Sequence, residues 1–442
     1  FNFRFGRNKT FIWKSNNYKE INIMSDTNKN RIITVIDIGT TKIVVLVAEY
    51  NTEENKISKI IGLGDSVSDG LNRGVVVDIT KTIKSVTKAV EMAEEQSGIE
   101  ISDAFVGISG DHISSLNYSG VTSIQSGNQN QAIGNSITDE DIEKVQELAA
   151  DINIPPDRRI MHVLPQEYVV DNQEGIASPL GLSGRRLEAK VHLVTSSINT
   201  EQDILTCLDQ VGINVVEFIL EPLASACSVL NQDEMKLGSI LIDIGGGTTD
   251  VISYANGSVL NTGVVPIGGA TITNDIAYRV QTSIEQAEEL KQKFGTSNLE
   301  ESNEDDNITV KGVAGRNEFK ISQKILAEVI QPRIKEIFEL SKEEIQKADF
   351  NGDYTFGIVL TGGGSKLDGI VKTAFDVFNM PIKKGEPVND FEIENSEINI
   401  FDPRYATAIG LVKFVGQNLN NYNKKSHSTL IDDIKEYLKD LF

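Results

Sequence analysis

Runs of β-branched apolar residues separated by glycine-rich turns are the strongest pattern in the chain. Such runs flank a tight turn within residues 31–50, which predicts a buried strand, a reversal and a second buried strand. The same strand–turn–strand pattern returns at 239–260. Apolar positions at helical spacing predict a helix over 78–97, which Gly98 ends. Because predicted strands and helices alternate, the pattern favours an α/β fold.

Residues 102–196 have a different pattern from the segments around them. A strand, a Gly/Asn/Gln-rich loop and a helix over 138–150 are followed by two long strands. Thr138 and Asp141 have the spacing of a capping box at the start of that helix. This order of elements predicts a small α+β subdomain. Helical periodicity or turn signals predict further helices at 200–212, from 221, and at 281–294, 323–347 and 404–415, with a buried strand at 354–360.

Two glycine-rich turns in different halves of the chain match each other. Val35–Lys42 resembles Leu241–Asp250, and the aspartates Asp37 and Asp243 are 206 positions apart (243 − 37 = 206). One such turn alone would be interpreted as a hairpin between core strands. Two copies at this distance predict two similar lobes rather than a short-period repeat.

Each turn has the composition of a phosphate-binding site. A carboxylate ends the strand, and the glycines that follow let backbone N–H groups converge on an anion. Turns from two lobes could hold one phosphate chain from opposite sides. Asp37 and Asp243 would then face each other beside the phosphates, which predicts an intervening Mg²⁺ held largely through water. No GxxxxGK[ST] motif is present, so the sequence gives little support to a P-loop site.

Two weaker features fit the same site. Gly362, Gly363, Gly364 and Ser365 follow a predicted buried strand, where backbone can pass beneath a base or ribose. Glu288 and Lys291 are one helical turn apart, so both could face the nucleoside. Taken alone, the glycines would indicate a turn and the charged residues a surface ion pair.

These motifs together resemble the actin, sugar-kinase and heat-shock-chaperone ATPase superfamily. Its five signatures have counterparts here: two phosphate motifs (Asp37–Lys42, Asp243–Thr249), two connecting helices (Glu221–Leu230, Arg404–Val412) and an adenosine motif (Thr361–Ser365). Within the superfamily the chain is most similar to the FtsA family of bacterial cell-division membrane anchors, over about 32–415. The further segments that carry this similarity are Thr262–Gly269, His162–Tyr168 and Pro179–Gly184.

The resemblance implies an actin-like, ribonuclease-H-like fold with two duplicated lobes, an inserted α+β subdomain and a C-terminal amphipathic helix. It implies that ATP is bound with Mg²⁺, that Asp37 and Asp243 hold the metal through water, and that Glu221 positions the attacking water. Such proteins are slow ATPases at most, so ATP would mainly set lobe closure. The remaining implied nucleotide contacts are Gly39, Thr40, Thr41, Lys42, Gly245, Gly246, Gly247, Thr248, Thr249, Glu288, Lys291, Gly362, Gly363, Gly364 and Ser365.

The resemblance also implies a division into subdomains. The first-lobe core would comprise 24–101, 197–236 and 402–416, with the inserted subdomain at 102–196. The second-lobe core would comprise 237–283 and 348–401, and 284–347 would form its outer subdomain. A flexible linker is predicted at 417–429, where the chain is Asn-rich and polar.

The last thirteen residues, 430–442, form an amphipathic helical pattern. Its apolar face consists of Leu430, Ile431, Ile434, Tyr437, Leu438, Leu441 and Phe442. A helix this short cannot span a bilayer, but it could lie in the membrane interface. Docking on the protein's own body is the alternative, and the polar linker favours the membrane. The polar face has two lysines against four acids, so attraction to anionic lipid is weak.

Composition argues against a nucleic-acid-binding protein and against a disulfide or zinc framework. The formal charge of −22 argues against non-specific nucleic-acid binding, and Cys207 and Cys227 lack the spacing of a disulfide or zinc framework. Residues 1–23 are basic and aromatic and precede Met24, so we interpret them as a non-native or disordered leader; a basic lipid-binding leader is the alternative.

The leading interpretation is therefore an ATP-binding scaffold at the cytoplasmic face of the membrane at the division site. By resemblance, it would tether the tubulin-like division protein FtsZ, bind other divisome proteins and self-associate into protofilaments. The FtsZ contact would lie in the outer subdomain of the second lobe. The alternatives are a small-molecule kinase on the same fold, for which Asp250 could serve as the base, and a pilus-assembly or shape-determining actin relative.

Overall fold

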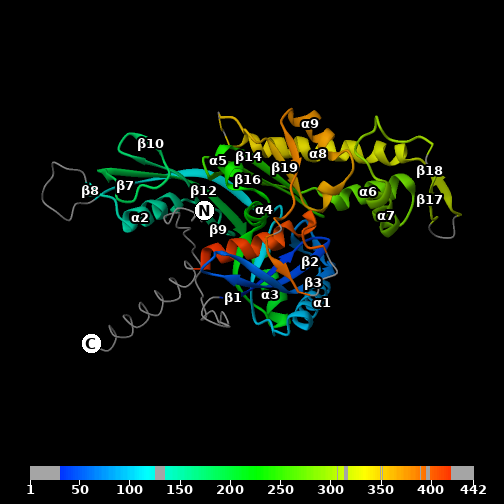
Figure 1. The fold of residues 1–442 in the computed structure, drawn as a ribbon, viewed down its shortest axis with the longest axis horizontal. Coiled ribbons are helices and arrows are strands. Elements are labelled where there is room, and N and C mark those ends of the chain that lie inside the picture. Colours follow the sequence, from blue (N-terminus) through cyan, green and yellow to red (C-terminus); the bar gives the residue numbers. More distant parts are fainter. Residues whose placement is uncertain are drawn as a thin grey trace.

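The computed structural model describes residues 30–124, 135–305, 307–312, 317–348, 350, 352–388, 390–394 and 399–419. Two mixed β-sheets form the centres of two lobes, and a third sheet extends to one side (Figure 1). The predicted leader at 1–23 and the amphipathic segment at 430–442 lie outside the described residues. Within the described residues, no helix is both long and apolar enough to cross a membrane.

The two central sheets have the same topology. In the first, the order is β13-β6-β1-β2-β3, with β21 added at the edge; in the second, it is β16-β15-β14-β19-β20. In each sheet an antiparallel three-stranded meander is extended by two strands parallel to its first strand. The predicted duplication is therefore present, and the actin-like α/β fold class is confirmed. The first-sheet strands are β1 (Asn30–Ile38), β2 (Lys42–Asn51), β3 (Lys56–Val67), β6 (Asp103–Ile108), β13 (Asn214–Leu220) and β21 (Glu392–Ile393). The second-sheet strands are β14 (Ser239–Ile244), β15 (Thr249–Ala255), β16 (Ser258–Val265), β19 (Ile358–Thr361) and β20 (Ile382–Lys384).

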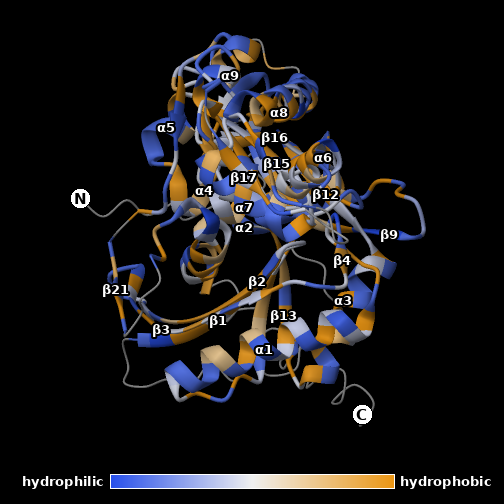
Figure 2. Cartoon of the chain, turned by 90° about the vertical axis from the view of Figure 1, so that its right-hand side faces the viewer, coloured by the Kyte–Doolittle hydropathy of each residue, from blue (hydrophilic) through white to orange (hydrophobic). Residues whose placement is uncertain are grey.

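Helices α1 (Ile79–Ser97) and α3 (Ile198–Val211) lie together below the first sheet (Figure 2). Asp78 caps α1 and Gly98 ends it with φ 69°, as the sequence pattern predicts. Gly64 allows the close approach of α1 to β3, because an added Cβ would lie 1.7 Å from the carbonyl oxygen of Ala89. A short hairpin, β4 (Leu71–Asn72) and β5 (Val75–Val76), connects β3 to this layer.

The inserted α+β subdomain is confirmed. Its sheet has the order β10-β9-β12-β7, and α2 (Asp139–Ala150) packs on β7 and β12 with the predicted capping box at Thr138. One boundary needs correction: β6 pairs with β1 in the first sheet, so residues 103–108 do not belong to the predicted 102–196 unit. The strands of the subdomain are β7 (Ser114–Ser123), β8 (Asn135–Ser136), β9 (Arg158–Val170), β10 (Gln173–Ile176), β11 (Ser183–Gly184) and β12 (Arg186–Ser197).

The outer part of the second lobe is built on three helices and a small hairpin. Helix α8 (Gln323–Gln346) matches its prediction, whereas α7 (Ile284–Phe294) starts three residues later than predicted because Ser283 caps it. Helix α6 (Gly269–Val280) was not predicted. The remaining elements are α4 (Glu221–Val229), α5 (Gln232–Leu237), α9 (Ile370–Phe378), β17 (Ile308–Val310), β18 (Phe319–Ile321), η1 (Gly363–Lys366) and η2 (Pro403–Tyr405).

Residues 406–419 form a helix that packs against both α4 and the first sheet. A Cβ on Gly410 would lie 1.8 Å from the carbonyl oxygen of Ala224, and one on Gly416 would lie 2.1 Å from the Tyr50 ring. Gly416 therefore permits close packing inside this helix, although its position next to polar residues suggested a helix end. The helix continues through 417–419, where a linker was predicted, and Leu419 is buried.

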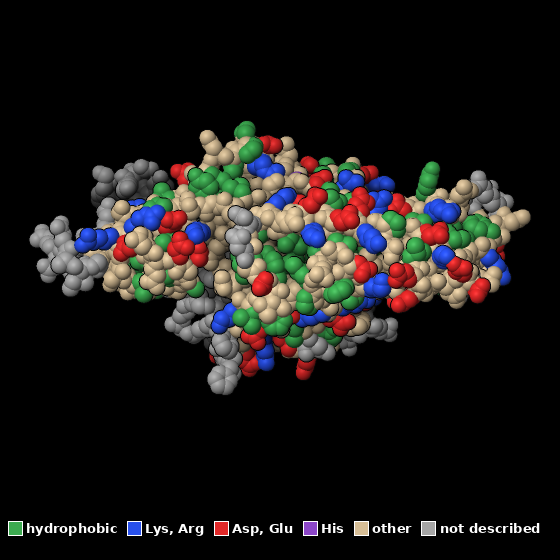
Figure 3. Space-filling view, turned by 90° about the horizontal axis from the view of Figure 1, so that it is seen from above, with side chains coloured by type: hydrophobic (Ala, Val, Ile, Leu, Met, Phe, Trp, Pro, Cys, Tyr) green, Lys and Arg blue, Asp and Glu red, His purple; other side chains and the backbone are tan. Residues whose placement is uncertain are grey.

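Acidic and basic side chains are interspersed on the face of the molecule seen from above (Figure 3). Elsewhere in the described residues, charged side chains form surface ion pairs, such as Lys372 with Glu300 and Lys347 with Glu344. Pairs of this kind contribute little to stability because water screens them. The surface therefore tells less about function than the buried charges between the lobes.

Candidate functional site

The two predicted phosphate turns have the same backbone geometry. The N–H of Gly39 donates to the carbonyl of Lys42 at 3.0 Å, and the N–H of Gly245 donates to the carbonyl of Thr248 at 3.0 Å. Each bond occupies the same position relative to the preceding aspartate, Asp37 or Asp243. We term residues 37–42 the first phosphate turn and residues 243–249 the second phosphate turn.

The structure brings these two turns into direct contact. A Cβ added to Gly246 would lie 2.2 Å from Oγ1 of Thr41, and one added to Gly247 would lie 2.3 Å from Oγ1 of Thr40. Real Cβ atoms do not approach other atoms this closely, so only glycine fits at both positions. The threonine hydroxyls of one lobe thus face the glycine backbone of the other, where a phosphate chain could be held from both sides.

Asp37 and Asp243 are both buried between the lobes. Asp37 accepts a 2.8 Å hydrogen bond from Nζ of Lys42, while Asp243 accepts bonds from Oγ of Ser225 at 2.6 Å and Oγ1 of Thr407 at 3.3 Å. Burial raises the pKa of Asp243, the Ser225 bond opposes that rise, and the charge of Asp37 adds to it. Ser225 and Thr407 were missed at the sequence level, because hydroxyls on the two connecting helices carry no distinctive spacing.

Two more carboxylates belong to the same group. Asp250 pairs with Asp243 across β15 and β14 and accepts a hydrogen bond from Oγ of Ser109. Burial is the main reason that the pKa of Asp250 rises to about 8. Glu221, at the start of α4, has its pKa raised well above the usual value by burial and by the charges of the three aspartates. Glu221 therefore lies beside the phosphate turns. Asp250 belongs to the same group of carboxylates, although the sequence suggested Asp250 only as the base of a kinase.

The donor set suits a metal ion that is bound through water. Within the described residues, no three His, Cys, Asp or Glu side chains lie close enough to hold a metal directly. Mg²⁺ commonly keeps several waters and takes only one or two carboxylates together with substrate phosphates. Asp37 and Asp243 fit that role, and a bound Mg²⁺ would neutralise charge on the phosphates.

The glycine triplet of the predicted adenosine motif lies beside the second phosphate turn. Because β19 is parallel to β14, the chain leaves both strands at the same edge of the sheet. Gly362 has φ 81°, and a Cβ there would lie 2.2 Å from Oδ1 of Asp243. Ser365 is buried and donates to the carbonyl of Gly362 at 2.7 Å, while a Cβ added to Gly363 would make an ordinary contact with Cβ of Arg404 at 3.9 Å.

Glu288 and Lys291 connect to the second phosphate turn through the start of α6. Nζ of Lys291 lies 2.7 Å from Glu288 and donates to the carbonyl of Gly269 at 2.9 Å. The N–H of Gly269 in turn donates to the carbonyl of Gly245 at 2.9 Å. Burial is the largest single influence on the pKa of Glu288 and would raise it, but the charge of Lys291 and the hydrogen bonds from Lys291, Thr273 and Gln292 together lower that pKa. Lys291 is thus mostly buried beside the site, while the Glu288 side chain remains partly exposed.

Further contacts join the two lobes. Lys366 of η1, in the second lobe, pairs with Asp402 of the first lobe. Within the first lobe, Arg404 and the hydroxyl of Tyr405 both bind Asp65 on β3, the latter at 2.6 Å. The inserted subdomain also bonds to edge strand β16, through His192 and Thr262 at 2.8 Å. The second lobe therefore contacts both the first lobe and the inserted subdomain.

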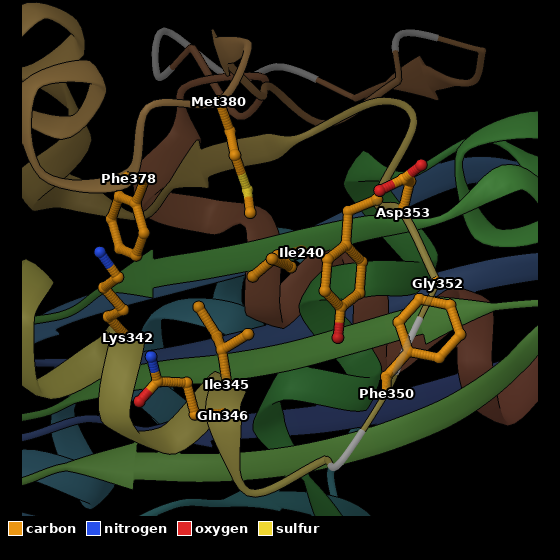
Figure 4. A pocket seen from close by; sticks show the side chains of 10 residues that line it. Ile240, Lys342, Ile345, Gln346, Phe350, Gly352, Asp353, Phe378 and Met380 are labelled. Atoms are coloured by element: carbon orange, nitrogen blue, oxygen red, sulfur yellow. The ribbon is translucent and has the colours of Figure 1, made fainter.

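A separate pocket of about 350 Å³ lies away from this site (Figure 4). It includes Ile240, near the start of β14, whereas Asp243 stands near the end of that strand. None of the sequence-predicted nucleotide residues lines it. Its lining is Ile240, Lys342, Ile345, Gln346, Phe350, Gly352, Asp353, Tyr354, Phe378 and Met380.

The buried carboxylates predict an unusual pH dependence of stability. The pKa of Asp250 is higher in the folded chain than its ordinary value of 3.8, so the stability gained by its protonation is lost as pH rises toward about 8. Asp250→Asn should therefore be more stable than wild type at pH 8 and differ less at pH 5. Denaturant unfolding at both pH values, with exposed Asp376→Asn as control, measures this. Equal effects of Asp250→Asn at both pH values would contradict it.

Comparisons with known proteins identify one family. A family model described as "Cell division protein FtsA" matches residues 240–410, and one described as "SHS2 domain inserted in FTSA" matches residues 110–195. The "Cell division protein FtsA" of Pseudomonas aeruginosa is 40% identical over 391 residues, covering 88% of this chain and 91% of the relative. That of Bacillus subtilis is 33% identical over 398 residues, covering 90% and 86%.

Solved structures with the same fold are more distant in sequence. A chain of the "PilM-PilN type IV pilus biogenesis complex" aligns with a TM-score of 0.62 at 16% identity, covering 87% of this chain and 98% of that one. MreB5 of Spiroplasma citri bound to ADP aligns with a TM-score of 0.51 at 15% identity, covering 88% and 98%. At such identities the similarity demonstrates the fold alone.

Proposed function

This chain belongs to the FtsA family of cell-division proteins, and from that premise we propose that it binds ATP with Mg²⁺ between its lobes and uses the bound nucleotide to regulate self-association at the membrane. The chain is an actin-like cell-division protein. The kinase, pilus-assembly and shape-determining alternatives are not favoured, because relatives that are 33–40% identical over most of the chain are cell-division proteins.

The observation that carries the nucleotide proposal is the contact between the two phosphate turns. Gly246 and Gly247 have room for no side chain because Thr41 and Thr40 of the other lobe lie against them. The turns also bring Asp37 and Asp243 together with Lys42 between the lobes. Backbone N–H groups and hydroxyls can donate to the phosphate oxygens of a nucleoside triphosphate, and a pair of carboxylates can hold the hydrated Mg²⁺ that accompanies it.

Lobe closure would be the main use of this site. Thr41 and Gly246 belong to different lobes and are in contact, so a phosphate chain bound beside this contact would touch both lobes and favour one relative orientation. The raised pKa values of Asp243, Asp250 and Glu221 describe carboxylates that are costly to ionise there. Glu221 would position a water molecule for slow hydrolysis.

The proposed partners are FtsZ, other divisome proteins, further copies of this chain and membrane lipid. The outer part of the second lobe, including α7 and α8, would bind FtsZ, while residues 430–442 would bind the cytoplasmic face of the membrane at the division site. Support for this assignment is the family membership and, for the tail, the apolar face in its sequence.

Magnesium dependence tests the nucleotide proposal. The wild-type chain should bind ATP more tightly with Mg²⁺ than with a chelator, measured by calorimetry. Asp243→Asn should remove most of that difference, because it deletes one of the two charges that would hold the hydrated ion.

Asp376→Asn is the matched control, since this exposed carboxylate on α9 pairs only with surface Lys372 among the described contacts. Failure of the wild-type chain to bind ATP in either condition would reject the proposed function. An undiminished Mg²⁺ effect in Asp243→Asn would reject the metal role of this residue.

A further inference from the structure

The β4–β5 hairpin has a two-residue connection and packs against the first phosphate turn. Leu71 pairs with Val76 and Asn72 with Val75, leaving Arg73 and Gly74 at the tip. Both have positive φ, 50° and 77°, as a type I′ turn requires. In Figure 2, β4 lies at a level between the sheet of the first lobe and the elements of the second.

Contacts of the tip and of the segment before it hold the hairpin in place. At the tip, the N–H of Gly74 donates to Oγ1 of Thr40 at 3.3 Å. Before β4, the N–H of Ser68 donates to the carbonyl of Thr41 at 3.2 Å. A Cβ on Gly74 would lie 1.9 Å from the carbonyl oxygen of Ser109, so the tip also touches the segment after β6. The hairpin is therefore fixed to the same threonines that face the second phosphate turn.

Arg73, at this tip, differs from the other cations near the phosphate turns because those cations are paired with acids. Lys42 is paired with Asp37, Lys291 with Glu288, and Arg404 with Asp65. The Arg73 side chain is exposed, and among the described residues it has no ion-pair partner. A site that holds four carboxylates and would receive a polyphosphate needs positive charge, and the other nearby cations are already neutralised by acids.

The order of strands indicates which phosphate Arg73 would meet. The adenosine motif follows β19, on one side of β14, whereas Asp250 stands on β15, on the other side. Ser109 joins the hairpin to Asp250, because its carbonyl lies against Gly74 and its hydroxyl donates to Asp250. Since adjacent strands are about 4.8 Å apart, β19 and β15 are separated by about 10 Å. A nucleoside at β19 would direct its phosphate chain toward β15 and the hairpin.

We propose that Arg73 binds the terminal phosphate of the nucleotide and makes the site favour the triphosphate over the diphosphate. This inference rests on the proposed nucleotide binding and adds a residue that distinguishes ATP from ADP. A guanidinium can donate two parallel hydrogen bonds to phosphate oxygens. Arg73 would reach the site from a hairpin that itself contacts Thr40 and Thr41. Binding of the terminal phosphate by Arg73 would therefore also affect the position of the first phosphate turn.

The test compares ATP and ADP affinities, each with Mg²⁺, by calorimetry on the full chain. Arg73→Asn is the sharpest variant, because Asn-Gly is the preferred type I′ sequence and the hairpin should keep its shape. We expect it to weaken ATP binding by about tenfold, the loss of one charge-assisted contact, while ADP affinity changes less than about twofold. Arg73→Lys should retain part of the preference for ATP.

Lys84→Gln is the control for general loss of charge, since Lys84 is an exposed residue on α1 in the same lobe. It should leave both affinities unchanged. Equal weakening of ATP and ADP by Arg73→Asn, or no change in either, would overturn the role of Arg73. If the wild-type chain bound neither nucleotide, the proposed function itself would fail, and the role of Arg73 would fail with it.

Discussion

Gly246→Val is expected to weaken ATP binding by roughly 10- to 100-fold without unfolding either lobe. An added Cβ at this position would lie 2.2 Å from Oγ1 of Thr41 and 2.8 Å from its Cβ, so rotation of the threonine side chain cannot relieve the clash. The two phosphate turns must then separate. Overpacking of this kind typically costs about 1–3 kcal/mol, which here would oppose the closed arrangement of the lobes. Calorimetry with Mg²⁺ and ATP measures the loss, and circular dichroism checks the fold.

Gly257→Asn is the matched substitution in the same lobe. Gly257 has φ 71° in the turn between β15 and β16, and no atom lies within 4 Å of an added Cβ. Asparagine tolerates that backbone conformation, so ATP affinity should stay at the wild-type value. Wild-type affinity in Gly246→Val would mean that the nucleotide does not require the contact between the turns, and the site described here would be wrong.

The contact between the turns could be predicted from the sequence because each turn is specified by a short continuous segment. Each turn follows a β-branched strand and contains its own glycines, so periodicity and turn chemistry are enough to locate it. The pairing of β6 with β1 is different. It joins residues about 70 positions apart in parallel, as Val35 with Phe105, and no local pattern specifies such a partner. For that reason β6 was placed in the inserted subdomain.

Helix α6 shows a different limit of sequence interpretation. Its buried residues Ile272, Ile276 and Val280 have helical spacing, but no helix was predicted there, and two glycines, Gly268 and Gly269, stand at its start. In the structure those glycines allow the helix to begin against the second phosphate turn, because a Cβ on Gly268 would lie 2.6 Å from the carbonyl of Gly246. Glycines that permit a close approach and glycines that end an element cannot be told apart from the sequence alone.

The residues around the carboxylates were harder to predict than the carboxylates themselves. Asp37 and Asp243 stand in recognisable motifs, whereas the donors come from distant parts of the chain. Ser225 and Thr407 donate to Asp243, and Ser109 donates to Asp250. Arg73 was not singled out either, since one arginine in a short polar turn resembles an ordinary surface residue. The hydrogen bond from Gly74 to Thr40 and the close approach of Gly74 to Ser109 place that turn beside the site.

Deletion of residues 430–442 is expected to abolish binding of the chain to phospholipid vesicles. The described body ends with buried Leu419, and the ten residues 420–429 (429 − 419 = 10) can extend at most about 35 Å. The segment beyond them has seven apolar residues at the spacing that would place them on one face of a helix. Each could contribute at most about 1.5–3 kcal/mol when buried in lipid, and the cost of forming a short helix reduces that sum. Co-sedimentation with vesicles measures the bound fraction.

Two double variants within the tail separate apolar burial from electrostatic attraction. Ile434→Glu with Leu438→Glu should release the chain as completely as the deletion, because both residues lie on the apolar face. Lys435→Gln with Lys439→Gln should retain most of the binding, since the four acids on the polar face already outweigh these two lysines. For the same reason, binding to zwitterionic and anionic vesicles should differ little, and added salt should have a small effect. Vesicle binding that persists after the deletion would show that another surface contacts the membrane, and the tail would then be free to dock on the protein itself.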